Sequence, residues 1–178
     1  MDVGEKGQRA ARMREAVAQF QGPLFRYAKR LLGDADTAND VVQDTFLRLW
    51  DTDRIANEDH LRRWLYLTCR RRCIDVMRLR DRRPGRLPRE TDRATTHGPA
   101  AHLAAREAAE RFERGFSALS ERQQEILRLK LVDGLSHKEV AAVTQMSVGN
   151  VGCQLHLAMQ ELKRLFPETQ QAGQRSVS

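Results

Sequence analysis

A stretch of twenty residues near the middle of the chain, 81–100, constrains the fold more than any other feature of the sequence. It holds three of the five prolines, two glycines and three threonines, and it has no repeating pattern of apolar residues. Proline and glycine interrupt helices and strands, and this composition is typical of a linker. The 178-residue chain is therefore predicted to form two small domains, which its length permits.

Helical periodicity runs along both sides of this linker. Before it, apolar residues recur every three or four positions in segments that end near Leu31, Trp50 and Leu79, with a break expected at Gly22-Pro23. Sustained alternation and clusters of β-branched residues, which would indicate strands, are nearly absent. The prediction is an all-α protein of two small helical domains. Its expected parts are domain one at 10–80, a flexible linker at 81–100, domain two at 101–166 and a disordered tail at 167–178.

The second domain has the order of a helix-turn-helix. Two segments have the spacing of a capping box, Ser120 with Gln123 and Ser136 with Glu139, so a helix is expected to begin after each serine. Ser147 then precedes a longer segment with helical periodicity. A short helix, a turn and a longer helix form the motif whose second helix enters the major groove of DNA.

Positive charge is concentrated in one block. The whole chain carries +7, but residues 60–89 alone hold eleven arginines and two aspartates, while the remaining 148 residues hold 20 basic and 22 acidic groups. Arginine matches phosphate geometry, so this block indicates nucleic-acid binding more than an ordinary solvated helix face. Trp64 and Tyr66 are interleaved with the arginines, and Trp64 is assigned to the core. The arginines expected on one side of this helix are Arg63, Arg70, Arg71 and Arg78.

An acidic segment lies just before this block. Residues 34–51 contain five aspartates and one arginine, and Asp40 and Asp44 are one helical turn apart with Gln43 beside them. Three interpretations stay open: a metal site for nuclease chemistry, a solvated face, or a face that docks on a basic protein surface. No third carboxylate or histidine stands at ligand spacing, which disfavours the metal site. Periodicity does not separate the other two.

Several classes of protein are disfavoured by composition. No apolar run has the length of a membrane span, and residues 1–14 have no hydrophobic segment of a secretory signal. Three cysteines argue against a disulfide framework, and Cys69 and Cys73 are expected to be small buried residues. No catalytic triad is recognisable. From composition we expect a cytoplasmic protein with an anionic partner; that it is not an enzyme and needs no cofactor or metal is implied only by the family resemblance described next.

The motifs resemble those of a known family. Residues 33–50, followed by Trp64-Leu65-Tyr66 and the arginines up to Arg78, resemble region two of the sigma factors of RNA polymerase, in the short extracytoplasmic-function group. Residues 118–123, 134–141 and 147–162 resemble region four. The resemblance covers most of residues 20–165 in the family order, with the linker between the two regions.

The resemblance implies a function and a set of contacts. Such proteins are dissociable, non-enzymatic subunits that direct core RNA polymerase to promoter DNA, where strands open and transcription begins. By resemblance, Asp40, Gln43 and Asp44 would meet the β′ clamp helices. The β flap and an anti-sigma factor are further expected partners. The loop 52–60, with Asn57 and His60, would capture a flipped base of the minus-ten element beside the arginine helix. The residues expected to read the minus-thirty-five element are Ser136, His137, Ser147, Val148, Gly149, Asn150, Gly152, Cys153, Gln154 and His156.

The sequence departs from the family in two places. Arg71 stands where the family usually has asparagine, and residues 147–160 contain no lysine or arginine where several are common. Gly149 and Gly152 also cost about 1 kcal/mol each unless they lie in a first helical turn. We therefore predict weak binding of the upstream element, with most DNA affinity carried by the arginine helix. The alternatives are a helix-turn-helix regulator that works without polymerase and a metal-dependent nuclease.

Overall fold

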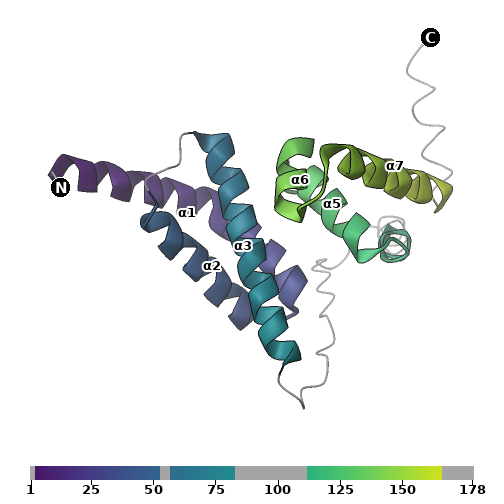
Figure 1. The fold of residues 1–178 in the computed structure, drawn as a ribbon, viewed down its shortest axis with the longest axis horizontal. Coiled ribbons are helices and arrows are strands. Elements are labelled where there is room, and N and C mark those ends of the chain that lie inside the picture. Colours follow the sequence, from purple (N-terminus) through teal and green to yellow (C-terminus); the bar gives the residue numbers. More distant parts are fainter. Residues whose placement is uncertain (1–2, 53–56, 83–111, 166–178) are drawn as a thin grey trace, which may run out of the picture. The chain divides into compact units, whose positions relative to one another are not determined.

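The computed structural model describes residues 3–52, 57–82 and 112–165 (Figure 1). All regular structure in these ranges is helical, as predicted, and the chain divides into two compact units, Met1–Ala94 and Thr95–Ser178. The predicted tail and nearly all of the predicted linker lie outside the described residues, so the domain bounds stay predictions. Among the described helices none is long and apolar enough to cross a bilayer.

The first unit consists of three helices, α1 (Val3–Leu32), α2 (Ala35–Trp50) and α3 (Glu58–Asp81). The break expected at Gly22-Pro23 was wrong, because α1 is one continuous helix of 30 residues with Pro23 inside it. A proline inside a helix costs about 3 kcal/mol. The buried side chains of Phe20 and Leu24 flank it, and burial of an apolar side chain of this size is worth about 1.5–3 kcal/mol. Packing on both sides of Pro23 therefore offsets the local cost.

Polar side chains start α2 and α3. The carboxylate of Asp34 accepts a hydrogen bond from the Thr37 N–H at 3.2 Å, and the amide oxygen of Asn57 accepts one from the His60 N–H at 2.8 Å. Each satisfies a backbone donor that the first helical turn leaves without a partner. Gly33, at φ 67°, ends α1 in the left-handed conformation, which allows the short turn into α2.

The core of the first unit lies between its three helices. Tyr27 of α1 packs edge-on against Tyr66 of α3, with ring centroids 5.5 Å apart. Tyr66 is 1% exposed, so it belongs to the core and not with the solvent-facing arginines. Trp50, the last residue of α2, is 42% exposed. The other fully or nearly buried side chains include Leu24, Val42, Phe46, Leu65, Cys69 and Cys73.

The second unit contains residues 112–117, which are helical, and then α5 (Glu121–Leu131), α6 (His137–Thr144) and α7 (Val148–Leu165). Both predicted capping boxes are present, and the Ser147 hydroxyl accepts a hydrogen bond from the Asn150 N–H at 3.2 Å at the start of α7. Helices α6 and α7 therefore form the predicted helix-turn-helix. Its turn uses Gln145 at φ 58°, a left-handed position that glycine usually fills.

Apolar residues of α5, α7 and the segment before α5 form a buried cluster in the second unit. Leu127 of α5 and Ala158 of α7 pack together with Phe116, and Leu155 and Leu162 border this cluster. The guanidinium of Arg128 lies over the Phe116 ring at 4.4 Å, which favours a cation–π contact. One side of α7 is thereby fixed against the unit, and the opposite side faces outward.

Candidate functional site

We call Asp40, Gln43 and Asp44 of α2 the acidic face. Asp40 and Gln43 are exposed, whereas Asp44 is partly buried. The Asp44 carboxylate lies 2.6 Å from Arg72 Nε of α3 and 3.9 Å from Arg48 Nε. The paired atoms Asp44 Oδ2 and Arg72 Nε are shielded from solvent and lack hydrogen-bond alignment, so the contact is an ion pair. The charge of Asp44 is thus largely balanced within the chain, while Asp40 presents its charge to solvent.

An apolar side chain extends the acidic face by one turn. Leu47 follows Gln43 and Asp44 on the same side of α2 and is 65% exposed. A single exposed leucine is common on protein surfaces, so Leu47 only adds apolar area beside the polar groups of the acidic face. Sequence reasoning missed Leu47, although its place outside the Val42 and Phe46 stripe was a usable signal.

The arginines of α3 divide into two groups, of which the first stabilises the fold. The Arg80 guanidinium donates to the Leu32 carbonyl at 2.9 Å and to the Thr37 hydroxyl at 2.7 Å, and it lies 3.5 Å from the Asp34 carboxylate. It therefore ties the end of α3 to the turn between α1 and α2. Arg72 joins α3 to α2 through Asp44 in the same way.

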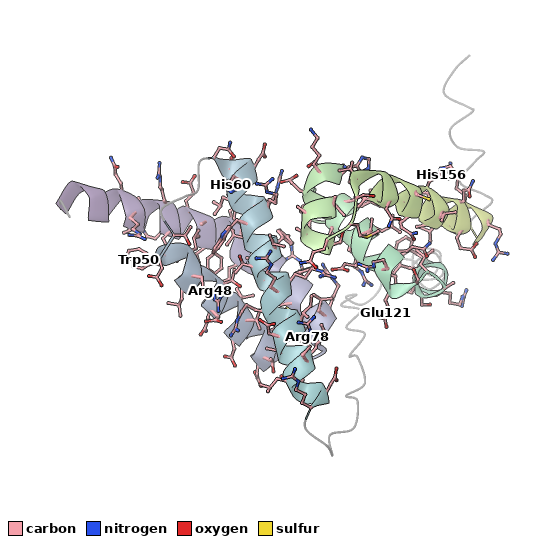
Figure 2. All side chains as sticks on the ribbon, viewed as in Figure 1. Arg48, Trp50, His60, Arg78, Glu121 and His156 are labelled. Carbon is pink, nitrogen blue, oxygen red and sulfur yellow. The ribbon has the colours of Figure 1, made fainter. Side chains whose placement is uncertain are left out.

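The second group, which we call the arginine face, is Arg63, Arg71 and Arg78. All three are exposed, and the structure assigns them no ion pair within the described residues. Figure 2 labels one of them, Arg78, on α3. Arg70, also predicted to bind DNA, is half-buried and interacts with other groups of the chain. The arginine face spans four turns of helix, so it can follow a strand of phosphates.

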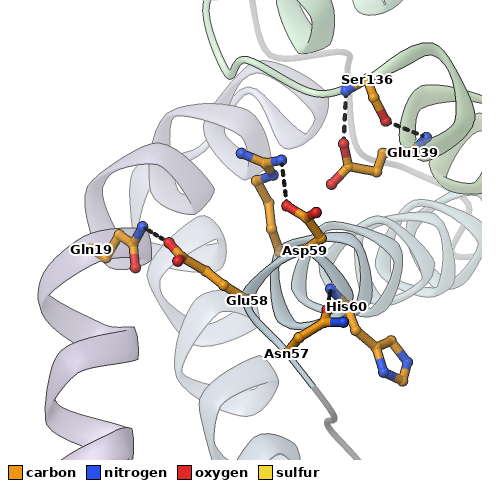
Figure 3. Close-up of polar contacts among 8 residues, drawn as sticks. Gln19, Asn57, Glu58, Asp59, His60, Ser136 and Glu139 are labelled. Atoms are coloured by element: carbon orange, nitrogen blue, oxygen red, sulfur yellow. Dashed lines mark hydrogen bonds and ion pairs between the residues drawn. The ribbon is translucent and has the colours of Figure 1, made fainter.

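The C-terminal end of the predicted base-reading loop lies at the start of α3. Residues 53–56 are outside the described part of the chain. Asn57 uses its amide oxygen to cap α3, which leaves the amide N–H₂ group to other partners (Figure 3). His60 is half-buried one turn later. Both predicted residues thus flank the N-terminus of the arginine helix.

The outward side of α7 carries the other predicted contacts. Val148, Gly149, Asn150, Cys153 and His156 are exposed, and Gly152 and Gln154 are half-buried. Ser136 and Ser147 cap helices with their hydroxyls, and His137 is exposed at the start of α6. A Cβ atom at Gly149 or Gly152 would meet no atom within 4 Å, so packing does not require either glycine. We call the exposed residues of 147–157, together with the half-buried Gly152 and Gln154, the reading face; the first cations of α7 come later, at Lys163 and Arg164.

The cysteines of the first unit are part of its core. Cys69 and Cys73 are fully buried, as predicted. A hydrogen bond with Cys73, together with burial, raises the pKa of the Cys69 thiol far above its ordinary value. Cys69 therefore stays protonated and inert, in contrast to the exposed Cys153. The described residues hold no cluster of three or more His, Cys, Asp or Glu side chains arranged for a metal ion.

Comparison with known proteins gives a consistent family match. Residues 16–83 match the family described as Sigma-70 region 2, and residues 109–162 match Sigma-70, region 4. The ECF RNA polymerase sigma factor SigL of Mycobacterium tuberculosis is 28% identical over 172 residues, which is 93% of this chain and 94% of that protein.

Two solved structures share the fold. The sigma factor RpoE in complex with the anti-sigma factor NepR, from Bartonella quintana, superposes with a TM-score of 0.61 at 22% identity, covering 87% of this chain and 96% of that one. CnrH in complex with the cytosolic domain of CnrY gives a TM-score of 0.56 at 25% identity, covering 90% of this chain and 94% of that one.

Proposed function

The chain belongs to the extracytoplasmic-function group of the sigma-70 family, and from this premise we propose how its surfaces divide the work of a sigma factor. It binds core RNA polymerase and directs promoter recognition, strand opening and transcription initiation. The observation that carries the division of roles is the separation of charge in the first unit. The acidic face lies on α2 and the arginine face on α3, with Arg72 and Arg80 joining the two helices.

The acidic face docks on core polymerase. A carboxylate and an amide on adjacent turns, with Leu47 one turn further, fit a cationic protein surface such as the β′ clamp helices. Asp40 supplies the greater part of the attraction, because the charge of Asp44 is already balanced by Arg72 and Arg48. The helix-turn-helix unit is assigned to the β flap by family resemblance.

The arginine face holds opened promoter DNA. Strand opening unstacks bases, and the separated strand keeps its phosphates, which arginines attract strongly at moderate salt. Asn57 and His60 lie at the N-terminal end of α3, directly after the base-reading loop. Base choice and phosphate binding therefore occur side by side. Arg63, Arg71 and Arg78 supply affinity, whereas Asn57 and His60 contribute to sequence choice.

The reading face of α7 makes the upstream contact with little electrostatic help. Asn150 and Gln154 have the amides that pair with adenine edges, and Val148 can contact a thymine methyl group. Without lysine or arginine in this face, phosphate attraction is small. A protein that bound duplex DNA alone through α7 would need that attraction, so a regulator independent of polymerase is not favoured.

No catalytic step is assigned to the chain itself, and its place of action is that of the polymerase, in the cytoplasm. RpoE is in complex with an anti-sigma factor, which supports a protein partner of that class for this chain. The chemistry of transcription belongs to the polymerase that the chain recruits.

Co-elution with core polymerase tests the proposal. Wild-type protein should co-elute with the core and yield transcripts from double-stranded templates. Asp40→Lys should weaken retention by at least about tenfold, because it places a cation against a cationic surface. Glu15→Lys, an equal charge change at an exposed position of α1, is the matched control and should co-elute normally. Failure of the wild-type protein to co-elute would refute the proposed function.

A further inference from the structure

The N-terminal half of α1 contacts the last residue of α2. The Arg9 guanidinium donates a hydrogen bond to the Trp50 carbonyl and lies over the Trp50 ring, with Cζ 5.4 Å from the ring centroid. Trp50 ends α2, so its carbonyl is one of those that a helix C-terminus leaves without an internal partner. A cation at this end also complements the helix dipole. Arg9 lies before residue 16, where the family match begins.

A second contact joins α1 to the first residue of α3. Gln19 Nε2 donates a hydrogen bond to Glu58 Oε1 at 2.8 Å (Figure 3). Glu58 directly follows the cap Asn57, and His60 comes two residues later. Ten residues separate Arg9 from Gln19, which is about 15 Å along a helix. One continuous helix thus holds both the end of α2 and the beginning of α3.

We propose that Arg9 and Gln19 are positioning residues for minus-ten recognition. Held to one rigid helix, the end of α2 and the start of α3 keep a fixed spacing, and Asn57 and His60 keep a fixed place beside the arginine face. Fixing these ends in advance removes conformations that DNA binding would otherwise have to order, which sharpens discrimination between bases. The inference rests on the proposed function and adds two residues that position its promoter-reading surface.

The placement separates this role from the roles already assigned. Neither residue belongs to the acidic face or to the arginine face, so polymerase docking and phosphate binding do not require them. Each instead contacts one end of the connection between α2 and α3. Their loss should change which promoters are chosen while leaving the affinity for polymerase intact.

Promoter selection by the holoenzyme tests the inference. Full-length chain and core polymerase transcribe a duplex library with a randomised upstream segment, and sequencing gives the base preferences at the minus-ten element. Arg9→Ala should lower the preference for the best base over the next by about two- to fivefold, the range expected from a lost cation–π contact. Arg12→Ala, an exposed arginine of the same helix, is the matched control and should keep the wild-type profile.

A charge-swap pair tests the second contact. Gln19→Glu sets two carboxylates against each other and should flatten the profile, whereas adding Glu58→Gln restores the hydrogen bond with its direction reversed and should restore the preference. Gln21→Glu on the exposed side of α1 is the control. Retention on core polymerase and the circular-dichroism spectrum are measured for every variant.

Two results would overturn the inference. One is a wild-type preference profile for both Arg9→Ala and Gln19→Glu. The other is a parallel loss of polymerase retention or of helix content, which would make these residues docking or folding residues. Because wild-type transcripts are the reference for the profile, a failure of the proposed function would appear separately, as an absence of those transcripts.

Discussion

Helices α3 and α7 are both surface helices assigned to DNA, and they differ sharply in charge. Seven arginines lie on α3, whereas residues 147–160, which include most of α7, carry no charged side chain. The structure reduces this contrast without removing it, because Arg72 and Arg80 are used to hold α3 against its neighbours. A count of arginines therefore overstates the charge available to DNA, and exposure and pairing decide which of them can bind it.

The two helices are suited to different parts of a promoter. Exposed arginines bind phosphates regardless of sequence and respond steeply to salt, while uncharged amides and apolar groups read base edges and respond weakly. We therefore place most of the DNA affinity on α3 and a smaller, sequence-dependent contribution on α7. The predictions below test this contrast, from the largest expected effect to the smallest.

Removal of the arginine face should have the largest effect. The triple change Arg63→Gln, Arg71→Gln and Arg78→Gln should lower open-complex formation by about a hundredfold and the salt slope by about 2, as expected for three phosphate contacts on a single strand. The measurement is holoenzyme binding to forked promoter DNA at several salt concentrations. Equal loss in a variant with glutamine at the exposed Arg12, Arg14 and Arg26 would show that net charge alone matters.

A second prediction separates the two groups of arginines within α3. Arg80→Ala removes hydrogen bonds to Leu32 and Thr37 and should lower the free energy of unfolding by about 2 kcal/mol. In a unit of this size the midpoint of thermal unfolding should fall by roughly 10 °C. Arg78→Ala should leave the melting temperature unchanged and weaken DNA binding. Thermal unfolding followed by circular dichroism distinguishes them, and equal melting temperatures would contradict the assignment.

The glycines of α7 give a smaller effect on stability. Gly152→Ala should raise the free energy of unfolding by about 1 kcal/mol, because alanine favours a helix and the new methyl group meets open space. If α7 contributes little affinity, transcription should change by less than about twofold. If Gly152 instead packed closely against DNA, the added methyl group would cost about 2 kcal/mol of binding free energy, which is about thirtyfold. A strong loss of transcription in this stabilised variant would place close DNA contact at Gly152.

A gain of affinity is the smallest change expected. Cys153→Lys adds one cation to the centre of the reading face and should steepen the salt slope on upstream duplex DNA by about 0.9. Affinity should rise about threefold at moderate salt, by the energy of one exposed charge contact. Cys153→Ser is the neutral control. An unchanged slope would mean that this side of α7 does not face the phosphates.

Much of the fold followed from local rules. The caps at Ser120, Ser136 and Ser147 and the apolar periods placed the helices within a few residues, because these signals depend on neighbours in sequence. Asn57 before Glu58 was an equally good cap signal that was interpreted only as a DNA contact. The expected break at Pro23 was wrong because packing against other helices outweighed the local preference.

The candidate sites were less predictable, because they depend on partners distant in sequence. Periodicity placed arginines on a helix but could not show that Arg80 turns toward Leu32 and Thr37 or that Arg72 balances Asp44. The burial of Tyr66 against Tyr27 and the exposure of Trp50 near Arg9 depend in the same way on α1. These distinctions decide which charges are available to a partner.

The most direct test compares two DNA probes cut from one promoter obtained by selection. One probe is the upstream duplex with the minus-thirty-five element, and the other is a forked fragment with the minus-ten element single-stranded. Holoenzyme binding to each is measured as a function of salt, with core polymerase alone as the background. We predict tighter binding and a steeper salt slope on the forked probe. Equal or tighter binding to the upstream duplex, with an equal or steeper slope, would contradict the division of affinity between α3 and α7.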